Sequence, residues 1–261
     1  MGSSLRRQIS WALDEYRAKP YSLREFLTKK GRWKHHLELM ESEEKGVHLR
    51  LEKLQIKLVK PPADTWIAYS DVIFHDAYTE FTDFLPRGLV LDIGAQYGDY
   101  AVLAAKSYGA TVHTFEPLPD NFSVLVQNIE LNDLRDRVVA HQASVGDHCG
   151  RGRMSFSGAM AVVGGKDSVE IESLTVDSLK MAPEILKIDV EGMEMEVLRG
   201  ALETLRRSKP KIIIETHSKR LRAQVDSFLK DIGYRCVHIN SRHTGEGWMD
   251  EKMNRFYLPG N

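Results

Sequence analysis

Acidic residues and glycines gather at two places in this chain of 261 residues, each time directly after an apolar run. The first place is LVLDIGAQYGDY, residues 89–100, in which Asp92 precedes Gly94 and Gly98. An apolar run followed by two glycines predicts a strand, a tight turn and a helix start, and glycine lets the main chain approach a ligand closely. The spacing is D-x-G-x-x-x-G, whereas dinucleotide-binding turns have G-x-G-x-x-G. A nicotinamide dehydrogenase is therefore disfavoured.

Two carboxylates indicate what this turn binds. Asp92 puts a negative charge at the turn, which disfavours a phosphate and favours a cation such as the α-ammonium group of an amino acid. Glu116 ends the next apolar run and follows Gly94 by 22 residues, close to the offset of about 20 at which a carboxylate receives ribose hydroxyls. A ligand with an ammonium and a ribose but no phosphate is S-adenosylmethionine. The sequence predicts this cofactor, although the glycines taken alone are equally consistent with a structural turn.

The second acidic place is LKIDVEGME, residues 186–194, again at the end of an apolar run. Because the carboxyl ends of parallel strands meet at one edge of a sheet, Asp189 is expected to border the transferable methyl group. Glu191 is assigned to the same site, whereas Glu194 is equally well explained as a favourable charge at a helix N-terminus. Ser144, after the third predicted strand, lies where the adenine would sit, and a loop without ligand contact is the alternative there.

The next apolar run, IIIETH, brings Glu215 and His217 to the same edge. Such residues could do general-base work or hold a divalent ion. His217 is the best single base candidate because its ordinary pKa is near neutrality, with a structural histidine as the alternative. Asp189 and Glu215 would supply two oxygen ligands to an ion. Zinc is disfavoured because no Cys/His pair has the usual ligand spacing, and metal dependence stays open.

The elements that must position these residues alternate between short apolar runs and helical periods from residue 88 onward, which predicts an α/β fold with a mostly parallel sheet. Residues 88–261 are assigned to this domain, with an insertion at about 145–179. Before it, residues 1–45 have a helical pattern, and residues 46–87 contain short strands around 47–51, 55–58, 66–69 and 72–74. The predicted strands of the domain are 89–93, 111–115, 138–141, 185–188, 212–214, 236–239 and 255–258.

Composition narrows the class of protein further. Cys149 and Cys236 are too few for a disulfide framework, and no long apolar run predicts a membrane span, so a cytoplasmic protein is expected. Residues 1–60 hold 14 Lys and Arg against 8 Asp and Glu, whereas the rest of the chain is acidic. This asymmetry is typical either of a nucleic-acid-binding surface or of a solvated helical face.

Five segments, DIGAQYGDY, TFEPLPDNF, LVQNIELN, KIDVEGMEMEVLRGA and IIIETH, resemble in this order the FkbM family of S-adenosylmethionine-dependent methyltransferases. The resemblance covers roughly residues 70–235, with Gln96 standing where the family usually has Asn. It implies a class I methyltransferase (Rossmann-like) fold with a seven-stranded sheet and helices on both faces. Residues assigned to cofactor binding are Asp92, Gly94, Ala95, Gly98, Glu116, Pro117, Ser144 and Asp189, and those assigned to catalysis are Lys187, Asp189, Glu191, Glu215 and His217.

The same resemblance implies O-methylation of a hydroxyl group on a small molecule or a sugar. A first alternative is an RNA methyltransferase, such as a tRNA-modifying enzyme, that uses the basic first 60 residues. A second alternative is a non-catalytic module that keeps the cofactor pocket but no acceptor site. The acceptor and the oligomeric state are left open by the sequence.

Overall fold

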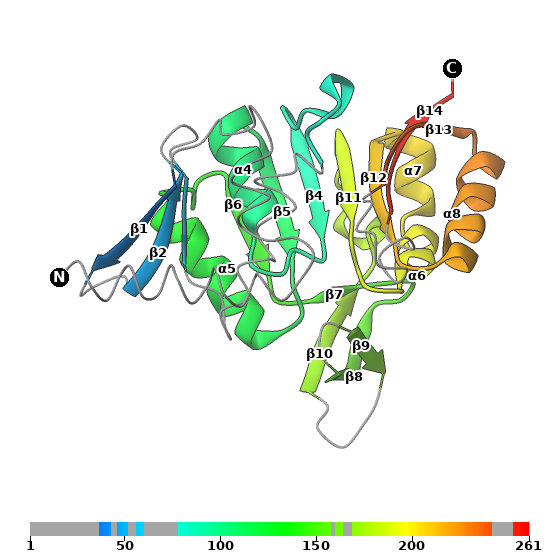
Figure 1. Ribbon diagram of the computed structural model, residues 1–261. Helices are drawn as coiled ribbons and strands as arrows, with labels where there is room; N and C mark the ends of the chain where they lie inside the picture. Colours follow the sequence, from blue (N-terminus) through cyan, green and yellow to red (C-terminus); the bar gives the residue numbers. More distant parts are fainter. Residues whose placement is uncertain are drawn as a thin grey trace.

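The computed structural model describes residues 37–42, 46–51, 56–59, 78–157, 160–163, 169–241 and 253–260. Its core is a seven-stranded sheet made of β4 (Leu89–Ile93), β5 (Thr111–Phe115), β6 (Val138–His141), β11 (Ile185–Ile188), β12 (Lys211–Thr216), β13 (Tyr234–Ser241) and β14 (Met253–Pro259). The strand order is β13-β14-β12-β11-β4-β5-β6, and only β14 runs antiparallel to its two neighbours (Figure 1). The predicted mostly parallel sheet is confirmed, together with its strand positions.

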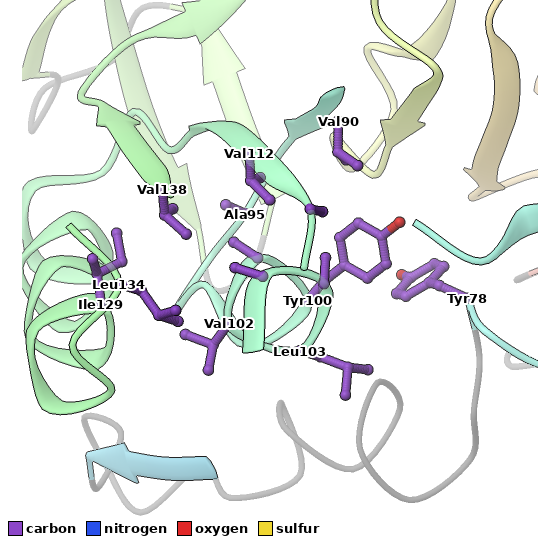
Figure 2. Packing of buried hydrophobic residues seen from close by; sticks show 14 of the residues in the cluster. Tyr78, Val90, Ala95, Tyr100, Val102, Leu103, Val112, Ile129, Leu134 and Val138 are labelled. Carbon is purple, nitrogen blue, oxygen red and sulfur yellow. The ribbon is translucent and has the colours of Figure 1, made fainter. Parts of the chain in front are cut away.

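Helices cover both faces of this sheet. Neighbouring residues of a strand face opposite ways, so Val90 of β4 joins one buried apolar cluster while Leu91 and Ile93 join the other. Figure 2 shows the first cluster, in which Val90 and Val112 of the sheet face the helices. The first cluster is covered by α4 (Asp99–Tyr108) and α5 (Pro119–Leu131), and the second by α6 (Glu194–Arg199), α7 (Leu202–Ser208) and α8 (Lys219–Asp231). Two 3₁₀ turns are η3 (Thr82–Phe84) and η4 (Asp177–Leu179).

A second, four-stranded sheet lies within the stretch that was predicted to be an insertion. Its strands are β7 (Ser144–Val145), β8 (Gly150–Ser157), β9 (Met160–Val163) and β10 (Val169–Leu174), in the order β7-β10-β8-β9. In Figure 1 this sheet projects from the main sheet near α6. The residue after β7 is in backbone contact with the end of α6, because a Cβ atom on Gly200, the C-cap of α6, would lie only 2.0 Å from the carbonyl oxygen of Gly146.

A third sheet precedes the main one in the chain and consists of β1 (Leu37–Ser42), β2 (Gly46–Leu51) and β3 (Ile56–Val59). The expected strands at 47–51 and 55–58 correspond to β2 and β3. The helical expectation was wrong for residues 37–42, because this segment pairs with β2 along its whole length as an antiparallel hairpin. The rest of the helical segment expected at residues 1–45 and the strands expected at 66–69 and 72–74 lie outside the described residues.

Two asparagines, Asn128 of α5 and Asn132 at the C-cap of that helix, bind this N-terminal sheet to the main domain. Asn132 accepts a hydrogen bond from the Lys57 N–H (2.9 Å) and donates to the Lys57 carbonyl (2.6 Å), as a neighbouring strand would. Asn128 accepts from the Val59 N–H (2.7 Å) and donates to the carbonyl of Tyr97 (2.8 Å), within the glycine turn after β4. The LVQNIELN segment thus has a structural role, since Asn128 joins the N-terminal sheet to this turn.

We expect Asn128→Ala to lower the free energy of unfolding by about 2–3 kcal/mol, because the Val59 N–H and the Tyr97 carbonyl both lose their partner. Urea unfolding followed by circular dichroism measures this change. Gln127→Ala is the matched control, since Gln127 is exposed and bonds only to Ser123 of its own helix, and it should change the free energy by less than about 0.5 kcal/mol. Equal effects of the two substitutions would contradict the role of Asn128.

None of the helices in the described part of the chain is both long and apolar enough to cross a membrane. Cys149 and Cys236 are free thiols at the surface.

Candidate active site

The carboxyl edge of the sheet begins with a buried ion pair between neighbouring strands. Lys187 of β11 stands opposite Asp92 of β4, which in turn stands opposite Thr114 of β5. The Lys187 ammonium lies 3.1 Å from Asp92 Oδ1, and the Thr114 hydroxyl donates to Asp92 Oδ2 at 3.0 Å. The ammonium also donates to the Gly94 carbonyl at 3.0 Å. This pair therefore links the glycine turn to the strand that carries the second acidic cluster.

The burial of this pair changes the roles expected for both residues. Asp92 has no exposed surface and Lys187 is 3% exposed. Asp92 was expected to meet the ammonium group of a ligand, but its carboxylate already neutralises Lys187. Burial by itself would lower the pKa of Lys187, yet the charges of Asp92 and Asp189 outweigh it and raise the pKa above its ordinary value. Lys187 stays an ammonium, so it positions the turn and does not take a proton.

Main-chain contacts shape the glycine turn. The N–H groups of Gly94 and Ala95 both donate to the carbonyl of Phe115 at 3.0 Å, which ties the turn to the end of β5. Gly94 has φ +79°, and a Cβ atom there would lie 1.8 Å from the Asp189 carbonyl oxygen. Glycine is therefore needed at position 94 because the main chain there packs closely against the backbone of Asp189, directly after β11. Gly98 has φ +76° and is the N-cap of α4, and a Cβ atom there would lie 2.9 Å from Leu125 Cγ.

Gly94→Ala and Gly109→Ala make a matched pair, since both glycines have φ values near +75° but nothing lies within 4 Å of a Cβ atom on Gly109. Gly109→Ala should cost about 1 kcal/mol of stability, from the left-handed backbone alone. Gly94→Ala should cost at least about 2 kcal/mol more, because the Asp189 backbone must move. Thermal unfolding of the two variants measures the difference. Equal costs would show that Gly94 does not pack against Asp189 in this way.

Glu116, directly after β5, is held in place by the turn. One carboxylate oxygen accepts the Gln96 N–H at 2.9 Å, and the other accepts the Leu118 N–H at 2.9 Å and the Asn121 amide at 3.3 Å. Burial raises the pKa of Glu116 to about 7, against the opposing effect of these hydrogen bonds and of Lys187. The carboxylate therefore has fewer stabilising donors than its burial demands, and hydroxyl groups of a ligand would supply them.

Pro117 and Ser144 were also assigned to the cofactor, and their positions carry less information about a ligand. Pro117 follows Glu116 and is half-buried, while Ser144 begins β7 and its hydroxyl donates to the Glu172 carbonyl at 3.2 Å. Contact of Ser144 with the adenine stays a prediction.

His217 lies at the centre of the second acidic cluster. Its Nδ1 is 2.6 Å from Glu194 Oε1. Its Nε2 lies 3.3 Å from Glu191 Oε2 and 3.6 Å from oxygens of both Asp189 and Glu215. The sequence prediction that Asp189, Glu191, Glu215 and His217 meet at one edge of the sheet corresponds to this geometry, and Glu194 joins them.

The surroundings of His217 do not suit the role of a general base. Burial would lower the pKa of the ring, but its contacts with Glu191 and Glu194 and the charges of Asp189 and Glu215 raise the pKa to about 10. With no cation bound, the ring is therefore an imidazolium at neutral pH and has no lone pair to accept a proton. The base role of His217 stays a prediction that this raised pKa disfavours, and the carboxylates around the ring are the alternative proton acceptors.

Tyr78 belongs to this cluster but was missed from the sequence. Its hydroxyl lies 3.0 Å from Asp189 Oδ2 and 3.3 Å from Glu215 Oε2, and its ring meets that of Tyr100 edge-on (Figure 2). It comes from the segment before the main domain, where no spacing or motif singles it out. Thr114 was also missed, although its position opposite Asp92 follows from the predicted alignment of the two strands.

Three features define a class I, S-adenosylmethionine-dependent methyltransferase. They are a parallel sheet with one antiparallel strand next to its edge, a glycine turn after β4 and an acidic residue after β5. The model of the "Methyltransferase FkbM domain" matches residues 92–236, more than half of the chain. The chain belongs to the FkbM methyltransferase family. The family resemblance stated from the sequence is confirmed, and with it an enzyme that uses S-adenosylmethionine.

Similar proteins include Methyltransferase sdnD of Sordaria araneosa, which is 25% identical over 62% of this chain and 79% of its own length. Hexuronic acid methyltransferase AglP of Haloferax volcanii is 29% identical over 49% of this chain and 55% of its own length. The crystal structure of Methyltransferase FkbM from Methylobacillus flagellatus has a TM-score of 0.55 and 21% identity, over 72% of this chain and 48% of that one. This last likeness concerns the fold. The chain spans about half the length of two of these three proteins.

Proposed function

We propose that this protein transfers a methyl group from S-adenosylmethionine to a hydroxyl oxygen of a sugar or another small molecule. The observation that carries the proposal is the acidic cluster of Asp189, Glu191 and Glu215 beside the glycine turn. Carboxylates accept hydrogen bonds from hydroxyl groups, and one of them can accept the proton that a hydroxyl must lose. The name of AglP, hexuronic acid methyltransferase, agrees with an acceptor of this kind.

The residues around the turn fit the cofactor. Glu116 would accept hydrogen bonds from the ribose hydroxyls, since its carboxylate is already oriented by the Gln96 and Leu118 N–H groups and is short of donors. Asp92 would support the turn indirectly. Its carboxylate pairs with Lys187, which donates a hydrogen bond to the Gly94 carbonyl, and we assign it no contact with the ligand. When bound, S-adenosylmethionine supplies an electrophilic methyl group on a sulfonium sulfur.

Glu191 is the carboxylate that we assign to proton removal. Its side chain is 29% exposed, slightly more than that of Asp189 at 25%, so both are accessible to an acceptor. Its backbone has φ +47°, an unfavourable conformation for a residue other than glycine, and strain of this kind, about 1 kcal/mol or more, is concentrated at functional sites. Glu191 would take the proton of the acceptor hydroxyl on a carboxylate oxygen.

The charge of the cluster argues against the RNA alternative. Four carboxylates lie around His217, and the phosphates of an RNA substrate would be repelled by them. Most of the basic residues 1–60 that favoured RNA lie outside the described residues. A neutral hydroxyl compound meets no such repulsion.

The pKa of Glu116 predicts how cofactor binding depends on pH. Only the ionised carboxylate accepts both ribose hydroxyls, so affinity for S-adenosylhomocysteine should be constant above pH 7 and decrease below it, approaching about tenfold per pH unit. Calorimetric titrations between pH 5.5 and about 8.5 measure this profile. Glu116→Gln should bind more weakly at pH 8 and lose the pH dependence. The same profile in Glu116→Gln as in the unsubstituted protein would remove Glu116 from the cofactor site.

A methyl-transfer screen tests the function itself. The protein is incubated with S-adenosylmethionine and with uronic acids, neutral sugars, polyketide-like alcohols or tRNA, and products are analysed by mass spectrometry and NMR. We expect one methyl group on an oxygen of a small hydroxyl compound. Glu191→Gln should lower kcat by about 10²-fold or more without changing the affinity for S-adenosylhomocysteine.

Glu196→Gln is the matched control for Glu191→Gln. Glu196 is an acidic residue of α6 whose carboxylate lies 3.3 Å from the Arg199 guanidinium on the helix surface, outside the cluster. It should keep full activity. Methylation of tRNA alone, or an unchanged kcat in Glu191→Gln, would overturn the proposal.

A further inference from the structure

Three metal-ligating side chains converge at the carboxyl ends of β11 and β12. One ligand atom from each of Asp189, Glu215 and His217 lies within 4.8 Å of the other two. Asp189 follows β11 directly, Glu215 lies within β12, and His217 follows β12. Their positions are therefore set by the two central strands of the sheet and not by a long loop.

The orientation of His217 is that of a metal ligand. Its Nδ1 is hydrogen-bonded at 2.6 Å to Glu194, whose side chain is fully buried and also accepts the Gly192 N–H at 3.2 Å. This contact fixes the ring and turns Nε2 towards Asp189 and Glu215. Metal-bound histidines characteristically donate their other N–H to a carboxylate in this way.

The surroundings of Nε2 give a second, independent indication. The His217 side chain is nine-tenths buried (10% exposed), and Nε2 completes no hydrogen bond, although three carboxylate oxygens lie at 3.3 to 3.6 Å. Ligand atoms at about 2.1 Å from a common ion are separated from one another by about 3.0 to 3.4 Å, for octahedral and tetrahedral geometry respectively. The proposed ligand oxygens of Asp189 and Glu215 both lie 3.6 Å from Nε2, slightly farther apart than ligands that share one cation, and the oxygen at 3.3 Å belongs to Glu191.

We propose that Asp189, Glu215 and His217 bind one divalent cation, with Glu194 as the carboxylate that orients His217. A donor set of two carboxylate oxygens and one imidazole nitrogen favours Mn²⁺ over Mg²⁺ and Ca²⁺, which prefer oxygen ligands alone. The four carboxylates around His217 make the cation electrostatically favourable. Tyr78, which contacts both Asp189 and Glu215, holds these two ligands together.

The use of the cation in catalysis rests on the proposed function, whereas its binding does not. Bound to the acceptor oxygen, it would lower the pKa of the hydroxyl group. The hydroxyl proton passes to Glu191, the oxygen forms a bond to the methyl carbon, and the carbon–sulfur bond breaks with its electron pair left on sulfur. The products are the methyl ether and S-adenosylhomocysteine, and no oxidant or reductant is needed.

Metal binding is tested on the full chain without an acceptor. The protein is freed of metal with a chelator and titrated with Mn²⁺, and free Mn²⁺ is followed by electron paramagnetic resonance, with Mg²⁺ and Ca²⁺ titrated by calorimetry. We expect one Mn²⁺ per chain and at least about tenfold weaker binding of Mg²⁺. No Mn²⁺ binding, or several weak equivalent sites, would overturn the inference.

Variants locate the site. His217→Gln and Asp189→Asn should each weaken Mn²⁺ binding at least about tenfold, and Glu194→Gln should weaken it by about 10- to 100-fold through loss of the His217 orientation. His148→Gln is the matched control, because His148 also pairs with a carboxylate, Asp147 at 2.8 Å, but at the exposed surface. It should bind Mn²⁺ normally. Because Glu194 is buried, folding of each variant is verified by circular dichroism, and Asp189→Asn, which is partly exposed, decides the result if Glu194→Gln unfolds.

The two proposals fail separately in these experiments. Stoichiometric Mn²⁺ binding without any methylated hydroxyl compound would support the metal site and refute the proposed acceptor. Methyl transfer to a hydroxyl group that persists with a chelator, in a protein that binds no Mn²⁺, would refute the metal site and leave the proposed function standing.

Discussion

The buried charge of Lys187 is the constraint on which the rest of the site depends. Removing an ammonium group from water costs several kcal/mol, and the sheet tolerates it because Asp92 lies 3.1 Å away and the Gly94 carbonyl accepts a hydrogen bond. The rings of Tyr78 and Tyr100 present their faces to the ammonium at 5.3 and 6.0 Å from their centroids. The ion pair spans two adjacent strands, so it sets the glycine turn and the second acidic cluster in a fixed relation.

This arrangement divides the acids at the sheet edge into two groups. Asp92 and Glu194 are fully buried and are paired with Lys187 and His217, respectively, so their charges serve the structure. Asp189 and Glu191 keep about a quarter of their side-chain surface exposed, and they are the acids that we propose act on a ligand. The same residue type thus has two roles, and the partner and the burial of each side chain decide between them.

The N-terminal sheet is connected to the cofactor side through hydrogen bonds and packing. Ile56 and Leu58 of β3 are fully buried in the cluster that also contains α4 and α5. Asn128 then carries this contact to Tyr97 in the glycine turn. Tyr78 contacts the second acidic cluster through Asp189 and Glu215. Segments that precede the family-matched residues 92–236 are thereby linked both to the glycine turn and to the second acidic cluster.

The amino-acid sequence by itself determined the seven strands, the glycine turn and the family, because apolar periodicity and glycine spacing are local signals. It also placed Glu116, Asp189, Glu191, Glu215 and His217 at one edge, since parallel strands share their carboxyl ends. It did not determine which charges are neutralised. Three features depend on distances between segments far apart in the chain. They are the buried pair of Asp92 and Lys187, the four carboxylates around His217 and the contact of Tyr78 with Asp189 and Glu215. Only the tertiary structure decided these, because burial and Coulomb energy vary with three-dimensional separation, on which residue spacing carries no information.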